Sequence, residues 1–174
     1  MATATLVPVS EYLRSRYEPD ADYVDGRIVA RPVGERDHSL LQRKLLLLLS
    51  TPPTEPFFIC TGELRIQVSA ANYRVPDLVL LGATAPVEQI VQTPPMLCIE
   101  ILLPDDTMPE TLVRAHDYIQ MGVPEVWIFD PRRRTVNLYD GEKLKTQVDG
   151  VLTVPGTPIT VSIADAFSVV QAGK

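Results

Sequence analysis

Hydrophobic and polar residues follow two rhythms along this chain, one typical of strands and the other typical of helices. Residues 64–68 read Leu-Arg-Ile-Gln-Val, the alternation expected of a strand with one buried face. Residues 75–81, 97–103 and 126–129 are almost continuously apolar, which is typical of central strands covered on both faces. With a further strand over residues 57–60, these segments predict a sheet inside the molecule.

Helical spacing marks two longer segments. Between residues 37 and 50, four side chains share one helical face: His38, Leu41, Leu45 and Leu48. Asp37 is the predicted N-cap of this helix. Thr107-Met108-Pro109-Glu110 is a capping-box pattern that opens a second helix to about Met121, and Gly122 is its predicted stop.

Turn signals and short elements complete the pattern. Asp25-Gly26 and Asp140-Gly141 each lie between β-prone segments and predict hairpins. A short helix with Ser10 as N-cap precedes the first hairpin, and residues 159–170 predict a strand and a short helix. The order of elements predicts an α/β domain with a mixed central β-sheet flanked by helices and extra hairpins at both ends.

The length and net charge of the chain limit the number of domains and the kinds of protein it can be. We expect 174 residues to form a single domain, with a core over about residues 10–140 and a C-terminal β extension over about 141–174. Apolar residues make up 45% of the chain and the net charge is −6, which excludes a disordered chain and a broadly basic protein that coats nucleic acid. A local basic groove stays open, because binding depends on where charge sits.

The cysteine content and the short apolar runs favour a cytoplasmic protein over a secreted or membrane protein. Two cysteines, Cys60 and Cys98, cannot form a disulfide-rich secreted framework, and neither belongs to a zinc motif. Residues 1–10 lack the positive start and apolar centre of a signal peptide, and the leucine run of residues 45–49 is far shorter than the roughly 20 residues of a membrane span. We therefore expect a soluble cytoplasmic protein with no membrane partner.

Two carboxylates stand in apolar surroundings. Glu100 lies within a predicted central strand, where a charge is costly unless it is paired, protonated or bound to a metal. Asp77 lies at the start of the other apolar run, so neighbouring strands would bring the two together and could bind Mg²⁺. The alternatives are a strand-start role for Asp77, a buried ion pair of Glu100 with an arginine, and a core role for His38.

Further polar residues follow at helical spacing. Glu110, Arg114 and Tyr118 share one face of the second predicted helix. An exposed Glu110–Arg114 ion pair, with Glu110 also in the capping box, is the simpler interpretation of this spacing. The basic run of residues 132–134 is typical of a solvated turn, although it could contact a phosphate.

The ordered set of motifs resembles the Uma-type family of bacterial putative restriction endonucleases, within the PD-(D/E)XK nuclease superfamily. The resemblance covers the chain from about Ser10 to about Tyr139. The matching motifs are Ala-Asp-Tyr-Val-Asp-Gly-Arg at 21–27, His38, Tyr-Arg-Val-Pro-Asp at 73–77, Glu-Ile-Leu-Leu-Pro-Asp-Asp at 100–106, the trio Glu110, Arg114 and Tyr118, and Met-Gly-Val-Pro-Glu-Val-Trp-Ile-Phe-Asp-Pro at 121–131.

This resemblance implies a restriction-endonuclease-like fold with a four-stranded core sheet and a metal site. Asp77 and Glu100 would bind Mg²⁺ or Mn²⁺, with His38 as a third ligand or as a partner of one. The superfamily lysine lies two residues after the glutamate, where this chain has Leu102; the family's displaced lysine corresponds to Arg114. Arginine stays protonated, so it can stabilise developing negative charge but cannot act as the base.

Three functions remain open on this interpretation. The leading one is a metal-dependent endonuclease that hydrolyses DNA, often as a homodimer in this superfamily, with Asp77, Glu100 and Arg114 as catalytic residues and Glu110 and Tyr118 in support. The alternative, favoured by Arg114 and the negative net charge, is a catalytically degenerate nuclease fold that serves as a binding or interaction protein. A sugar hydrolase that uses two carboxylates without metal ranks last.

Overall fold

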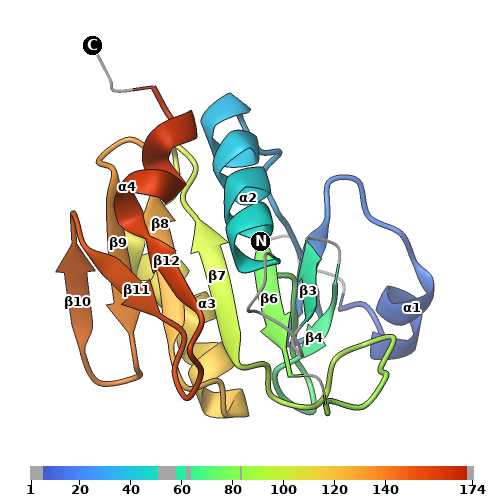
Figure 1. Cartoon of the computed structure of the whole chain (residues 1–174). Helices are drawn as coiled ribbons and strands as arrows, with labels where there is room; N and C mark the ends of the chain where they lie inside the picture. The colour runs from blue at the N-terminus through green and yellow to red at the C-terminus, as the bar shows by residue number, and fades with distance from the viewer. Residues whose placement is uncertain (1–5, 51–57, 62–63, 83, 172–174) are drawn as a thin grey trace.

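A six-stranded mixed sheet forms the centre of the computed structural model, which describes residues 6–50, 58–61, 64–82 and 84–171 (Figure 1). Its strand order is β10-β9-β8-β7-β6-β3. The strands are β3 (Phe58–Thr61), β6 (Leu78–Leu81), β7 (Leu97–Ile101), β8 (Val126–Asp130), β9 (Thr135–Tyr139) and β10 (Leu144–Gln147). Strands β7 and β8 are parallel and the other pairs are antiparallel. The sheet is wider than the four-stranded core that the resemblance implies, because β3 and β10 extend its two edges.

Helices cover both faces of this sheet. Helix α2 (Arg36–Leu49) and the short α4 (Ile163–Ala166) lie on one face, and α3 (Met108–Met121) lies on the other (Figure 1). Every residue of β7 and β8 is buried, so the expectation of central strands covered on both faces is confirmed. Along β7, Ile99 packs on the α2 side while Cys98 packs on the α3 side, as the alternation of a strand requires.

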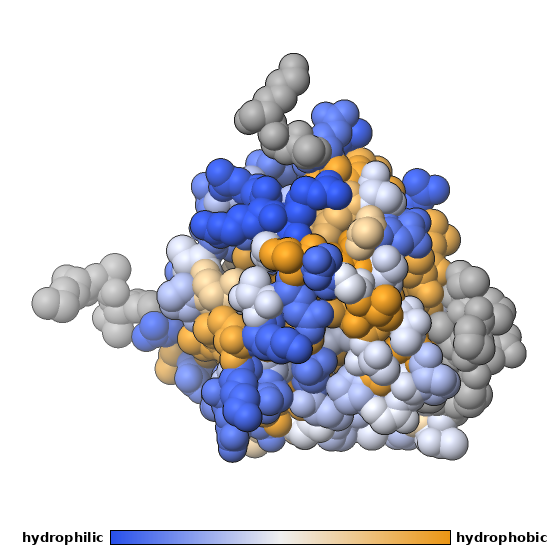
Figure 2. All heavy atoms as spheres, turned by 60° about the vertical axis from the view of Figure 1, so that its left-hand side comes forward, coloured by the Kyte–Doolittle hydropathy of each residue, from blue (hydrophilic) through white to orange (hydrophobic). Residues whose placement is uncertain are grey.

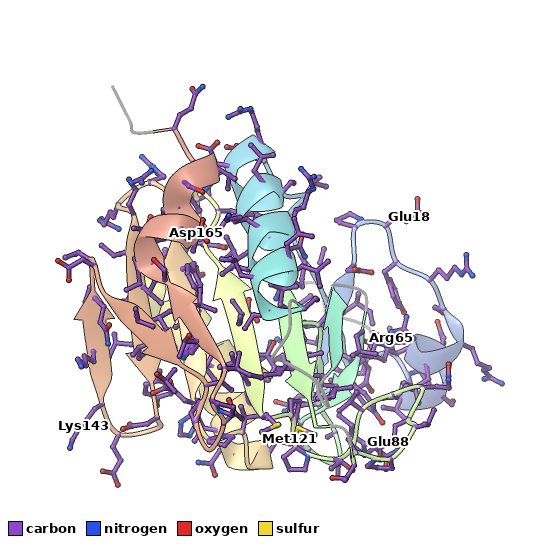
Figure 3. All side chains as sticks on the ribbon, in the orientation of Figure 1. Glu18, Arg65, Glu88, Met121, Lys143 and Asp165 are labelled. Atoms are coloured by element: carbon purple, nitrogen blue, oxygen red, sulfur yellow. The ribbon has the colours of Figure 1, made fainter. Side chains whose placement is uncertain are left out.

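A second, smaller sheet stands beside the first, with strand order β2-β1-β5-β4. Its strands are β1 (Ala21–Val24), β2 (Arg27–Ala30), β4 (Ile66–Gln67) and β5 (Tyr73–Arg74). Three tyrosines from α1 (Val9–Arg14), β1 and β5 stack together: Tyr12, Tyr23 and Tyr73. Arg65, labelled in Figure 3, lies over the Tyr12 ring and donates hydrogen bonds to the carbonyls of Leu13 and Ser15, so it fixes α1 to this sheet.

Strand boundaries differ from the expected ones where proline and turns intervene. The predicted strand 75–81 begins only at Leu78, because Pro76 has no N–H for a ladder and Val75 donates its N–H to Asp22 instead. Tyr73–Arg74 belongs to the smaller sheet. The predicted strand 64–68 is shorter than expected, and residue 57 of the strand predicted over 57–60 lies outside the described residues.

Helix ends confirm one capping prediction and correct two. Thr107 caps α3 and bonds to the Glu110 side chain, and Gly122 ends the helix at φ 113°. Helix α1 begins two residues earlier than a Ser10 cap requires, directly after the extended Pro8. Helix α2 is capped by the backbone position of Glu35 rather than by Asp37, which lies in the first helical turn.

The buried face of α2 also differs slightly from the prediction. Leu49 is buried where Leu48 was expected, and Leu48 packs at the edge of the core. The C-terminal segment supplies the partner of this face: β11 (Val151–Thr153) pairs with β12 (Thr160–Ser162), and α4 and η1 (Phe167–Val169) follow. Lys44 of α2 pairs with Asp165 of α4 at 2.6 Å (Asp165 is labelled in Figure 3).

The outer surface mixes hydrophobic and hydrophilic residues. On the face that Figure 2 shows, apolar residues form separate patches among polar ones. None of the helices in the described ranges has the length and apolar character that a membrane crossing requires.

Candidate functional site

The two carboxylates singled out in the sequence come together at one end of the central sheet. Strands β6 and β7 are antiparallel neighbours with Leu78 opposite Ile99, and continuing this register places Asp77 opposite Glu100. Glu100 is fully buried and Asp77 is 9% exposed. The two carboxylates thus lie on neighbouring strands, as the predicted site requires.

A cation that the sequence analysis did not single out lies between the two carboxylates. Arg31, which directly follows β2, places its Nη2 atom 3.2 Å from Oδ1 of Asp77 and 3.0 Å from Oε2 of Glu100. The two negative charges raise the pKa of Arg31 above its ordinary value, although burial alone would lower it. The buried ion pair of Glu100 with an arginine, one of the alternatives that the sequence left open, is thus present.

Helix α3 contributes two more partners of Glu100. Tyr118 donates its O–H to Oε1 of Glu100 at 2.7 Å, and Arg114, one turn away, has Nε 3.3 Å from Oε2. Burial and then the charge of Glu100 raise the pKa of Tyr118 well above its usual value, so its hydroxyl remains a donor. Glu110 is exposed and bonds to Thr107, so it stays at the helix start while Arg114 pairs with Glu100.

Asp77 is held by a backbone donor and by His38 as well as by Arg31. The N–H of Ile101 donates to Oδ2 at 2.7 Å, and Nε2 of His38 lies 3.4 Å from Oδ1. Burial alone would raise the pKa of Asp77. The hydrogen bond from His38 and the charge of Arg31 outweigh burial and hold this pKa below its ordinary value. The carboxylate is therefore stabilised in its charged form.

Three nitrogen atoms at this site are buried without a hydrogen bond within the described residues: Arg31 Nη1, His38 Nδ1 and Arg114 Nε. The Arg114 nitrogen is near Glu100 but is not aimed at it, so the contact is one of charge rather than a hydrogen bond. Such atoms are rare in protein interiors, because a buried donor without an acceptor costs free energy.

The space around these groups includes a small cavity and a wider hollow next to it, and a further hollow of about 290 Å³ adjoins Arg31, His38 and Asp77. The cavity, of about 50 Å³, is lined by Arg31, His38, Asp77 and Arg114 among others. The hollow, of about 300 Å³, is lined by Leu102, Leu103, Pro104, Asp106, Asp130, Arg132 and Arg133. Leu103 and Asp106 line both spaces, so the two are adjacent.

A second buried ion-pair network, also absent from the sequence analysis, supports the site from the smaller sheet. Arg74 pairs with Asp22 at 2.9 Å and with Asp117 of α3 at 2.6 Å. Asp22 in turn accepts the N–H of Val75 and lines the cavity. This network ties β1, β5 and α3 together around the carboxylate pair.

The arrangement of donors does not fit a divalent metal ion. Each oxygen of Asp77 and Glu100 already faces a donor, and the guanidinium of Arg31 lies between the two side chains where a shared ion would have to lie. Mg²⁺ requires several oxygen ligands and is repelled by neighbouring cations. Within the described ranges, no three His, Cys, Asp or Glu side chains come together in a way that could hold a metal.

The position at which the resemblance implies a lysine is also apolar. Leu102 points to the same side of the sheet as Glu100, two residues along, and is buried with the α3 cluster. Around the carboxylate pair, the described cationic groups are thus Arg31 and Arg114, together with His38 when it is protonated.

Comparison with known proteins agrees with this fold and these motifs. A model of the Uma2 family, described as "Putative restriction endonuclease", matches residues 9–165. The chain belongs to this family. Its fold is also that of a solved protein described as a putative nuclease belonging to DUF820, from Anabaena variabilis ATCC 29413. That match has a TM-score of 0.81 and 23% identity, and covers 93% of this chain and 98% of the other. No curated protein matches the chain.

Membership confirms the resemblance and the fold class. Asp77, Glu100, Arg114 and Tyr118, which carried the resemblance, lie together in the folded chain, and Arg31 lies between the two carboxylates. The chain is therefore a member of the Uma2 family, and the centre of its own pocket carries two arginines.

Proposed function

We propose that this member of the Uma2 family binds nucleic acid without hydrolysing it. The observation that carries the proposal is the position of Arg31, whose guanidinium contacts both carboxylates at once and occupies the place between them. The absence of a lysine near Glu100 in the described part of the chain points the same way, because arginine keeps its proton and cannot activate a water molecule as a base.

The free energy needed to break the ion pairs of Arg31 with Asp77 and Glu100 favours a pocket that is not catalytic. Removing one partner of a buried ion pair costs about 3–5 kcal/mol, because the other charge is left uncompensated. Withdrawal of Arg31 would leave Asp77 and Glu100, both nearly inaccessible to water, close together with like charges. An ion that entered the pocket would first have to offset this cost.

Nucleic acid remains the best-supported partner because of the hollow beside the cavity. Arg132 and Arg133 form one side of it, and the Arg133 side chain is 80% exposed although it pairs with Asp130. Arginines on an open surface are the residues that contact phosphate groups most readily. The net charge of −6 limits non-specific affinity, so we expect binding that is weak and strongly dependent on salt.

DNA binding by these arginines can be measured by fluorescence anisotropy of a labelled duplex over a range of salt concentrations. The slope of log K against log salt is negative. In the Arg132→Ala/Arg133→Ala variant we expect it to become shallower by about 2, one unit for each phosphate that is no longer neutralised. Lys143→Ala is the control, since Lys143 lies beyond the opposite end of β9 (Figure 3). An unchanged slope in the double variant would contradict the proposed binding surface.

A second candidate is metal-dependent hydrolysis of DNA with Mg²⁺ or Mn²⁺ by a homodimer. It is favoured by one observation: Oδ1 of Asp77 and Oε2 of Glu100 face the same nitrogen atom, so both can share one cation. This candidate requires Arg31 to leave the pocket. Plasmid cleavage by the wild-type chain with either metal, abolished in both Asp77→Asn and Glu100→Gln, would establish it in place of the first.

A further inference from the structure

We infer that Arg31 is an internal substitute for the divalent ion, and that the chain keeps a latent cation site which its own arginine fills. The inference rests on the proposed function, because it assumes that the wild-type pocket works without a metal. It adds a specific consequence: removing the guanidinium should convert Asp77, Glu100 and His38 into a site for a divalent cation.

The geometry at the guanidinium is that of a shared cation. A single atom, Nη2, contacts one oxygen from each carboxylate, which is how an ion joins two carboxylate ligands. The other oxygen of each carboxylate accepts a hydrogen bond: Oδ2 of Asp77 from the N–H of Ile101, and Oε1 of Glu100 from the Tyr118 hydroxyl. The two oxygens that face Arg31 are therefore held in place by contacts that do not involve Arg31.

The backbone places Arg31 at this point. Its N–H donates to the carbonyl of Asp20 at 2.6 Å, directly after β2 has paired with β1 through Ala21 and Ala30. Pro32 follows and favours an extended conformation at Arg31. The side chain thus leaves the smaller sheet and enters the cavity at the end of the main sheet, so that one residue joins the two.

Once Arg31 is removed, His38 would be the third ligand beside the two carboxylates. His38 is nine-tenths buried, its Nε2 lies 3.4 Å from Oδ1 of Asp77, and its Nδ1 has no hydrogen bond in the described part of the chain. Two carboxylate oxygens and one imidazole nitrogen form a donor set that suits Mn²⁺, which accepts both oxygen and nitrogen ligands. The Arg114 guanidinium remains nearby and limits the affinity of such a site.

Thermal unfolding with and without MnCl₂ tests the inference. The wild-type Tm should be the same in MnCl₂ and in EDTA, because the site is already filled. Arg31→Ala should lower Tm by at least about 5 °C in EDTA, since two buried carboxylates lose their cation, and Mn²⁺ should restore most of the loss. Arg31→Ala/Asp77→Asn should not respond to Mn²⁺. Arg36→Ala, which removes an exposed arginine, should resemble the wild type.

Several outcomes would overturn the inference. One is Mn²⁺ binding to the wild type, measured by calorimetry, that disappears in Glu100→Gln. Another is an Arg31→Ala protein that folds but binds Mn²⁺ no more tightly than the wild type. If Arg31→Ala does not fold, Arg31→Met, which keeps more of the side-chain volume, is measured instead. Folding of either variant only in the presence of Mn²⁺ would support the inference. A wild-type chain that binds no metal and cuts no DNA, with a variant indifferent to Mn²⁺, would refute this inference and leave the proposed function intact.

Discussion

The partners of Glu100 show how single residues keep a fully buried charge in place. Arg31 and Arg114 supply positive charge, while Tyr118 supplies a neutral donor from α3. A buried carboxylate needs both charge compensation and hydrogen bonds, because burial removes the water that would provide them. The role of each partner can therefore be separated by substitution.

Tyr118→Phe removes one hydrogen bond to Glu100 and keeps the ring. We expect the free energy of unfolding to fall by about 1–3 kcal/mol, since a buried acceptor loses its donor. Tyr139→Phe is the matched control, because the Tyr139 hydroxyl bonds to a half-buried carbonyl and its loss should cost less. Urea unfolding gives both values, and equal losses would show that the bond to Glu100 has no special weight.

The lowered pKa of Asp77 makes part of the stability depend on pH. Its ordinary value is 3.8, and in the folded chain the pKa lies below it, so the carboxylate stabilises the fold above about pH 4. This contribution is lost as the pH falls through the folded pKa. The difference in unfolding free energy between wild type and Asp77→Asn should be largest above about pH 5 and shrink below about pH 4. A difference that stays constant from about pH 3 to 7 would contradict this assignment.

Helix α3 supplies two of the partners of Glu100. It places Arg114 and Tyr118 one turn apart on the face that meets β7, and its ends are fixed by Thr107 and Gly122. The helix begins only a short loop after the end of β7 at Ile101, so its start determines where both side chains lie relative to Glu100.

Thr107→Ala removes the cap of α3 and should lower the free energy of unfolding by about 1 kcal/mol. Thr107→Ser keeps the capping oxygen and is expected to cost little. Because Glu110 bonds to the same hydroxyl, Glu110→Ala should add little further loss in a protein that already carries Thr107→Ala. Thermal unfolding of the three variants checks this; additive losses would mean that the capping box does not act as a unit.

The elements that local patterns define were predictable, and the contacts between distant segments were not. The capping box of α3, the two hairpin turns and the continuous strands β7 and β8 each depend on neighbouring residues. The helix starts at Val9 and Arg36 were misplaced because Ser10 and Asp37 cap helices only where the backbone is still extended.

Arg31 illustrates why part of the site could not be predicted. It lies 46 and 69 positions before its partners Asp77 and Glu100, in no motif, and only the pairing of two sheets brings it to them. The sequence did indicate that Glu100 needed a partner, and an arginine was one of the alternatives. Which arginine it would be depends on where the smaller sheet lies, which no local pattern specifies.

In the folded molecule, part of the net charge of −6 comes from acidic groups that are buried rather than exposed. Several acidic groups are paired inside with arginines: Asp22 with Arg74, and Asp77 and Glu100 with Arg31. Because these acids are buried and paired, they repel DNA less than exposed, unpaired acids would. The arginines beside the hollow, Arg132 and Arg133, are by contrast on the surface.

The most direct test of the account is a crystal structure of the wild-type chain grown with MnCl₂, with anomalous difference density measured at the pocket. We expect the guanidinium of Arg31 between Asp77 and Glu100, at the distances found here, with no anomalous peak between the two carboxylates. A manganese peak shared by Asp77 and Glu100, with Arg31 displaced from the pocket, would contradict the account and favour a metal-dependent nuclease.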